Sequence, residues 1–169
     1  MESITLTEER IYELLDAVCD PEIPVLSVLD LGIVRGVSLD TPDGIPEVRI
    51  TPTYTGCPAM DMIGVNIKAV LQEAGISPVR VKLVLHPAWT TDWLTDRGRQ
   101  RLQEYGIAAP REQTVDKHAL FTDGDLTVPC PRCSSEDTEL LAEFGSTACK
   151  AMYRCKTCLE PFDYFKCHR

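Results

Sequence analysis

Residues 130–158 read CPRCSSEDTELLAEFGSTACKAMYRCKTC, a stretch that begins and ends with a Cys-x-x-Cys pair. Two intervening residues let both thiolates of a pair point at a common centre. Two such pairs, Cys130/Cys133 and Cys155/Cys158, separated by 21 residues, are typical of a Cys₄ zinc ribbon. We therefore predict one shared tetrahedral metal site. The alternatives are two disulfides or four free thiols.

A metal held by four thiolates has no open coordination position, so this site is expected to be structural. The sequence does not choose between Zn²⁺ and iron, because a Cys₄ site suits both. Chemistry must then be sought outside the ribbon.

The chain of 169 residues fits one ordinary domain followed by a small one, and its apolar fraction of 44% is enough for a folded core. We predict a first domain at 1–108, a polar linker without periodicity at 109–125, and the ribbon at 126–169. Short strands are expected in the ribbon at Glu139–Phe144, Lys150–Arg154 and Pro161–Lys166.

The first domain is predicted to be α+β, a small mixed sheet with helices packed on it. Thr7 is a good cap for a first helix, and a loop rich in proline and acid follows it from Pro21 to Asp30. Strands are expected at Ile33–Leu39, Glu47–Thr53 and Val79–Leu85, and a last helix at Asp92–Tyr105. A helix that begins at Pro58 is expected to bury Ala59, Ile63, Ile67, Val70, Leu71 and Ala74. Arg97, Arg99 and Arg101 on that last helix are expected to form a solvated exterior.

Charge limits the classes of partner. Residues 1–125 hold 11 Lys and Arg against 20 Asp and Glu, whereas residues 126–169 hold six of each. A ribbon that binds nucleic acid needs a basic face, so nucleic acid is not an expected partner. No apolar run is long enough for a membrane span, and MESITLTEER lacks the apolar core of an export signal. With eight cysteines, reduced thiols in the cytoplasm are expected.

Cys57 is the main candidate for chemistry. It follows Gly56 and precedes the helix that begins at Pro58, where free N–H groups and the helix dipole are expected to lower its pKa. Such a thiolate could attack a substrate, ligate a metal or receive an iron–sulfur cluster. The alternative is a cysteine that acts as a small buried apolar residue.

Asp20, Glu22 and Asp30 lie in the loop after the first helix, where they could be hard metal ligands or ordinary solvated acids. His86 ends the third strand, and a pair with Cys57 would resemble the nucleophile and base of a hydrolase, although no orienting acid can be named.

Cys149 and Cys167 exceed what a four-ligand site needs. They could serve a second metal-handling function or pack within the ribbon. Cys19, at the end of the first helix, is expected to pack in the core.

Several of these stretches resemble a known family. DPEIPVLSVLDLGIV, at 20–34, and TPTYTGCPA, at 51–59, resemble the two signatures of the metal–sulfur cluster biosynthesis family, with Cys57 at the position of the family's reactive cysteine. Two further stretches point to a narrower group of proteins: AWTTDWLTDRGRQRLQEYGIAAP, at 88–110, and the tail from Glu143 to Arg169. They resemble the D subunits of bacterial phenylacetyl-CoA epoxidase systems.

The resemblance implies an accessory protein of aerobic phenylacetate degradation, not the oxygenase itself, that helps to mature or insert a metal centre. It implies transient iron or an iron–sulfur cluster at Cys57, Asp20, Glu22 and Asp30, and a structural metal at the four ribbon cysteines. The implied partners are the oxygenase or reductase subunits of the epoxidase and general iron–sulfur assembly proteins. The principal alternative is a structural or docking subunit that handles no metal.

Overall fold

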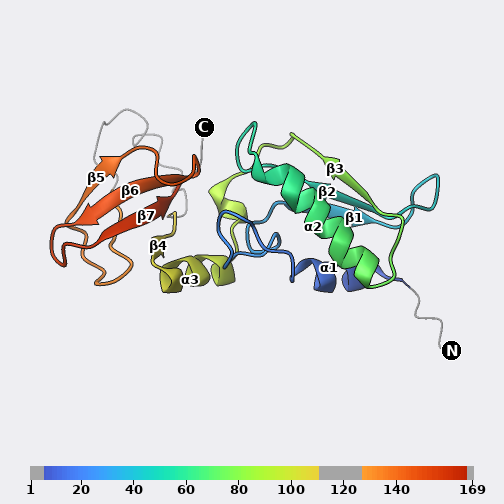
Figure 1. The fold of residues 1–169 in the computed structure, drawn as a ribbon, viewed down its shortest axis with the longest axis horizontal. Helices are drawn as coiled ribbons and strands as arrows, with labels where there is room; N and C mark the ends of the chain where they lie inside the picture. The colour runs from blue at the N-terminus through green and yellow to red at the C-terminus, as the bar shows by residue number, and fades with distance from the viewer. Residues whose placement is uncertain (1–5, 111–126, 167–169) are drawn as a thin grey trace. The chain divides into compact units, whose positions relative to one another are not determined.

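The computed structural model describes residues 6–110 and 127–166. The chain divides into two compact units, Met1–Trp89 with Trp93–Gly98, and Thr90–Asp92 with Arg99–Arg169. Each unit is built on its own small sheet (Figure 1), which is the predicted α+β class. None of the helices within the described residues has the length and hydrophobicity to span a bilayer.

The first unit begins with helix α1 (Glu8–Leu15), whose amino end is fixed by Thr7. The Thr7 side chain accepts a hydrogen bond from the Arg10 N–H, which satisfies one of the free donors of the first turn. Ile11 and Leu15 are buried on the inner face of this helix. Cys19, which follows it, is exposed, so the prediction that it packs in the core is wrong.

A three-stranded sheet forms the centre of the first unit. Strands β1 (Val34–Ser38) and β2 (Glu47–Ile50), both predicted, form an antiparallel hairpin, and β3 (Arg80–Leu83) lies parallel to β2 at the other side. β3 is an edge strand, and its Leu83 is 52% exposed although the paired Ile50 is buried.

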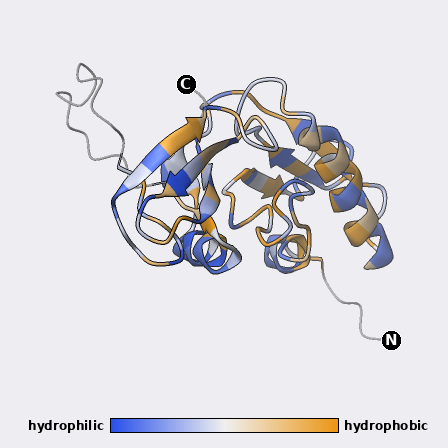
Figure 2. Ribbon diagram, turned by 60° about the vertical axis from the view of Figure 1, so that its left-hand side comes forward, coloured by the Kyte–Doolittle hydropathy of each residue, from blue (hydrophilic) through white to orange (hydrophobic). Residues whose placement is uncertain are grey.

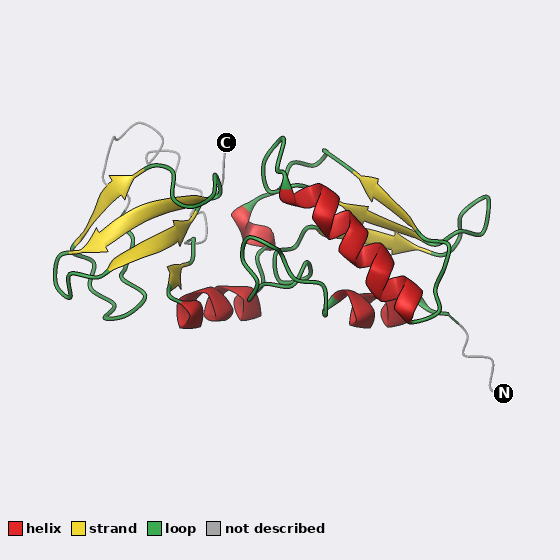
Figure 3. Ribbon diagram, in the orientation of Figure 1, coloured by secondary structure: helices red, strands yellow, loops and turns green. Residues whose placement is uncertain are grey.

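Helix α2 (Ala59–Glu73) returns the chain from β2 to β3 and lies across one face of the sheet (Figures 1 and 3). Hydrophobic and hydrophilic stretches alternate along its ribbon (Figure 2), as expected for a helix with one buried face. The residues buried on that face are Ala59, Met60, Ile63, Ile67 and Leu71. Val70 is half-buried, and Ala74 is exposed, so the predicted burial of Ala74 is wrong.

The predicted helix at Asp92–Tyr105 is divided in two. A short 3₁₀ turn (Thr91–Trp93) comes first, and α3 (Asp96–Tyr105) follows. Thr95 separates them because its Oγ1 accepts a hydrogen bond from the Gly98 N–H at 3.0 Å, which caps the new helix.

The second unit carries a four-stranded sheet in the order β4-β7-β6-β5. Strands β5 (Thr138–Ala142), β6 (Lys150–Cys155) and β7 (Pro161–Phe165) are antiparallel neighbours, and all three were predicted. Ala151, Tyr153 and Phe162 form much of the small core beneath them.

Strand β4 (Ile107–Ala108) was not predicted. It pairs in parallel with β7, so these two residues, which the sequence analysis placed in the first domain, lie in the sheet of the second unit. The predicted linker at 109–125 lies outside the described residues apart from 109–110.

Candidate metal centre and thiol site

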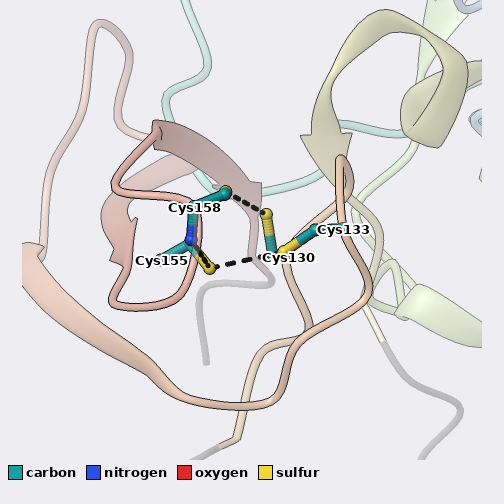
Figure 4. A group of neighbouring side chains, drawn as sticks. All are labelled: Cys130, Cys133, Cys155 and Cys158. Atoms are coloured by element: carbon teal, nitrogen blue, oxygen red, sulfur yellow. Dashed lines mark hydrogen bonds between the residues drawn. The ribbon is translucent and has the colours of Figure 1, made fainter.

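The four ribbon cysteines converge. The Sγ atoms of Cys130, Cys133, Cys155 and Cys158 all lie within 4.8 Å of one another, and Figure 4 shows the two pairs facing each other. Two of the separations are 3.7 Å (Cys130 to Cys158) and 3.6 Å (Cys133 to Cys155). Tetrahedral Zn²⁺ with Zn–S bonds of about 2.3 Å places its sulfurs about 3.8 Å apart. The thiols therefore fit a tetrahedral metal ion.

The two Cys-x-x-Cys turns have the same backbone design. The Cys130 N–H donates to the Ser135 carbonyl at 2.9 Å, and the Cys155 N–H donates to the Glu160 carbonyl at 3.0 Å, five residues ahead in both cases. Each turn then places the residue after its second cysteine at positive φ: 59° at Ser134 and 65° at Leu159. The sequence thus builds the same turn twice, which brings four sulfurs to one centre.

The electrostatics of these thiols also favour a cation. The Cys158 N–H stabilises the Cys155 thiolate and lowers the pKa of Cys155 to about 6. The Glu160 backbone favours the Cys158 thiolate, but burial and the other three sulfurs outweigh it and raise the pKa of Cys158 to about 12. Four thiolates this close repel one another, so a bound cation is needed before all four ionise at neutral pH.

Cys149 does not belong to this group. Its side chain is buried, and its Sγ lies 3.1 Å from Oγ1 of Thr147. Its backbone carbonyl accepts from the Lys166 N–H at the end of β7. This environment favours the packing interpretation of Cys149. Cys167 lies outside the described residues.

Cys57 lies between the end of β2 and the start of α2, half-buried. Its N–H donates to the Tyr54 carbonyl at 3.2 Å, and its own carbonyl accepts from the Met60 N–H at 3.3 Å. Gly56 before it has φ 83°, a left-handed conformation that suits glycine. This turn presents the thiol at the amino end of α2, as predicted.

The predicted lowering of the Cys57 pKa is wrong. Burial is the largest effect and raises the pKa of the Cys57 thiol, and the negative charges of Glu22 and Asp20 raise it further. The Ala59 N–H favours the thiolate but is outweighed. The sequence around Cys57 shows only the local helix end, whereas the two carboxylates lie more than thirty residues away along the chain.

Those two carboxylates belong to the loop after α1, which folds back on itself. The Asp20 N–H donates to the Leu26 carbonyl at 2.9 Å, and the Val28 N–H donates to the Val18 carbonyl at 2.8 Å, so the base of the loop is closed. Within it, Oδ1 of Asp20 accepts from the N–H groups of Glu22 and Ile23. The fold thus brings Asp20 and Glu22 near enough to Cys57 to act on its charge.

Asp30 has a different environment. Its side chain is fully buried, and its Oδ1 accepts from Nε of Arg97 at 2.6 Å and from Oγ1 of Thr95 at 3.2 Å. Arg97 also pairs with Asp16 at the end of α1. Arg97 is therefore not part of a purely solvated helix face, and sequence spacing gave no signal of this pairing across 67 residues.

His86 is exposed beyond the end of β3. No hydrogen bond joins it to Cys57 in the part of the chain that the structure describes. The nucleophile-and-base arrangement of a hydrolase gains no support from this geometry.

Comparisons with known proteins agree with this two-part arrangement. Residues 8–83 match the family model described as iron–sulfur cluster assembly protein, and residues 115–166 match the model of the PaaD zinc beta ribbon domain. The chain is 49% identical over 158 residues to a protein of Escherichia coli (strain K12) that carries the provisional name of the D subunit of 1,2-phenylacetyl-CoA epoxidase. The match covers 94% of this chain and 92% of that protein.

Two further similarities concern the first unit. The chain is 35% identical over 97 residues to a Fe-S protein maturation auxiliary factor of Porphyromonas gingivalis, which covers 57% of this chain and 90% of that protein. The crystal structure of a domain of unknown function, DUF59, from Bacillus anthracis is similar with a TM-score of 0.51 and 27% identity. It covers 56% of this chain and 90% of that one.

Proposed function

The chain belongs to the family of phenylacetyl-CoA epoxidase D subunits, and we propose that it is an accessory factor that matures an iron-containing centre of such a monooxygenase. In this proposal it is not the oxygenase. Its clients are the oxygenase or reductase subunits of the epoxidase, general iron–sulfur assembly proteins supply the cargo, and the protein acts in the cytoplasm.

The position of Cys57 carries the proposal. A half-buried thiol at the amino end of α2, within the segment that matches the iron–sulfur assembly family, has the carboxylates of Asp20 and Glu22 near it. A thiolate suits iron or a cluster as cargo, and two carboxylates add negative potential that attracts a cation. The raised pKa means that the thiol is mostly protonated at neutral pH, so binding of the cargo must release that proton.

We give the ribbon cysteines a separate, structural function. Cys130, Cys133, Cys155 and Cys158 would hold one Zn²⁺, with iron as the alternative, and would stabilise a unit whose core is small. Analysis of metal and acid-labile sulfide after anaerobic purification distinguishes the two metals. One zinc per chain without sulfide supports the assignment.

Asp30 is not part of the proposed transfer site. It is fully buried against Arg97 and Thr95, so its oxygens are engaged within the fold. We assign it a structural function in the loop that carries Asp20 and Glu22.

The principal alternative is a structural or docking subunit that handles no metal at Cys57. The ribbon favours some docking function because Leu140, Leu141 and Phe144 in and after β5 are about half exposed or more. In our proposal the same ribbon docks the client, so exposure alone does not distinguish the two functions.

The distinguishing experiment is Cys57→Ala in a cell that lacks the native gene and grows on phenylacetate. We expect a folded protein, loss of growth, and reduced iron in the epoxidase subunits. Cys19→Ala is the matched control because Cys19 is an exposed cysteine of the same unit, and it should support normal growth. Normal growth and normal client iron with Cys57→Ala would favour the docking subunit.

A further inference from the structure

A later segment of the first unit, Trp89 with Trp93–Gly98, packs on the loop that carries Asp20 and Glu22, although it lies beyond the residues that match the iron–sulfur assembly family. Trp89 is buried and donates from Nε1 to the Leu31 carbonyl at 2.7 Å. The Thr95 N–H donates to the Asp30 carbonyl at 2.9 Å. Two backbone carbonyls at the end of the loop are thus satisfied by this later segment.

Arg97 makes the most extensive contacts of the segment. Its Nε donates to the buried Asp30 carboxylate at 2.6 Å, and its Nη1 donates to Oδ2 of Asp16 at 3.0 Å. One planar guanidinium therefore spans two carboxylates, one at the end of α1 and one at the end of the loop. These two residues mark where the loop begins and ends.

Ser27 connects this ion-pair network to the closed base of the loop. Its Oγ donates to Oδ1 of Asp16 at 3.1 Å and accepts from the Asp30 N–H at 3.1 Å, and its own N–H donates to Oδ2 of Asp30. Ser27 also bridges to Cys19, the residue before Asp20. The hydrogen bonds of this bridge run between the flanking residues, from the Asp20 N–H to the Leu26 carbonyl and from the Val28 N–H to the Val18 carbonyl. Ser27 thus joins the Arg97 network to the backbone bridge that closes the base of the loop beside Asp20.

We propose that Arg97 is a positioning residue that, through Asp16, Asp30 and Ser27, holds the loop so that Asp20 and Glu22 stay near Cys57. Without Arg97, the buried Asp30 carboxylate loses its cationic partner, which is a costly state for a buried charge. We expect the loop to move so that the Asp30 carboxylate reaches solvent. Asp20 and Glu22 then move away from Cys57, and the potential there becomes less negative. The inference builds on the proposed function of Cys57, but its test uses this protein alone.

The test compares two alkylating reagents of similar size that react with the same thiolate. The zinc-loaded protein is treated at low ionic strength with equal amounts of anionic iodoacetate and neutral iodoacetamide. Mass spectrometry of the peptide that contains Cys57 gives the ratio of carboxymethyl to carbamidomethyl product. Because both reagents consume one thiolate, the pKa and exposure of Cys57 cancel, and the ratio reports the local potential.

Asp20→Asn with Glu22→Gln sets the scale. Removal of two nearby negative charges should raise the ratio about threefold, since close charge pairs near a protein surface interact by about 1 kcal/mol or less. An unchanged ratio would show that the loop exerts no field on Cys57 and would overturn the proposal.

Arg97→Gln then separates positioning from simple loss of charge. If the loop stays in place, removal of a positive charge makes the site more negative and the ratio falls or stays the same. If Arg97 positions the loop, the ratio rises toward that of the double variant, about twofold or more, despite the extra net negative charge. Arg80→Gln is the control. Arg80, at the start of β3, also pairs with two carboxylates, those of Asp43 and Glu47. Its replacement removes the same charge elsewhere in the protein and should not raise the ratio.

Arg97→Lys keeps the positive charge but loses the planar guanidinium that reaches both carboxylates. If Arg97→Gln does not fold, this variant tests whether Arg97 positions the loop. Circular dichroism and zinc content identify the folded variants. We expect a raised ratio with Arg97→Lys as well. A ratio equal to that of the parent in the folded Arg97→Lys protein, or an unchanged or lowered ratio in folded Arg97→Gln, overturns the proposal.

Discussion

The Sγ atoms of Cys130 and Cys158 lie 3.7 Å apart, so the first cysteine of one turn meets the second cysteine of the other. Cys133 and Cys155 repeat this relationship at 3.6 Å. The two turns therefore face each other across one centre, with each first cysteine opposite the second cysteine of the other turn. A metal at this centre joins the segment before β5 to the end of β6.

Loss of one ribbon ligand should unfold the ribbon. Cys130→Ser or Cys155→Ser is expected to release the metal, because both side chains are buried and face the shared centre. Metal binding contributes about 10 kcal/mol or more in small zinc domains, which exceeds what a small core supplies. Metal analysis and limited proteolysis measure the effect, with Cys19→Ser as the control. A ribbon that resists protease without metal would contradict this expectation.

Gly32→Ala should be strongly destabilising because glycine is required there for two reasons. Gly32 has φ 66°, and a Cβ would lie 2.2 Å from the backbone oxygen of Trp93. Gly44→Ala is the matched control, since Gly44 has φ 70° with nothing within 4 Å of a Cβ. We expect a loss of about 1 kcal/mol for Gly44→Ala and about 3 kcal/mol or more for Gly32→Ala. Similar midpoints of urea unfolding for the two variants would refute the close contact with Trp93.

Local patterns predicted most of the secondary structure because the interactions that set it are local. Thr7 caps α1 three residues ahead, and the Cys-x-x-Cys spacing fixes each turn within six residues. Strand β4 was not predicted because it contains only Ile107 and Ala108. It depends on pairing with β7, more than fifty residues later in the chain.

Only part of the candidate site was predicted, because here too the sequence shows local interactions and not those between distant residues. The convergence of the four ribbon thiols follows from the spacing of their pairs. The raised pKa of Cys57 depends on burial and on Glu22 and Asp20, which only the folded chain brings near. The partnership of Arg97 with Asp30 likewise joins residues that no periodicity relates.

The raised pKa of Cys57 predicts a weak nucleophile at neutral pH. Below its folded pKa the thiol is mostly protonated, so its alkylation by iodoacetamide should be slower than that of an unstructured peptide of the same sequence. Each unit of upward pKa shift lowers the thiolate fraction about tenfold in this range. The rate should continue to rise with pH after the peptide has reached its plateau. A plateau of the Cys57 rate at a lower pH than that of the peptide would contradict the direction of the shift.

Removal of the nearby carboxylates should shift the pKa of the same thiol in the opposite direction. Asp20→Asn and Glu22→Gln each remove a negative charge that disfavours the thiolate, so both should lower the pKa of Cys57. The alkylation rate at neutral pH should then increase. Burial, the largest cause, remains, and the pKa is expected to stay above the ordinary value in both variants.

The last prediction concerns the two cysteines beyond the four-ligand site. Cys149→Ser with Cys167→Ser should keep one ribbon metal and a protease-resistant ribbon, because the four converging thiols already fill a tetrahedral ion. Burial of Cys149 beside Thr147 makes a modest loss of stability expected, about 1 kcal/mol, since serine nearly preserves its volume but adds a polar hydroxyl. Delivery of iron to the client separates the two interpretations of this pair. Reduced delivery by a folded, metal-loaded double variant would assign the pair to metal handling, and the single variants would then identify the residue responsible. Loss of the ribbon metal would instead mean that the four ligands named here are not the complete set.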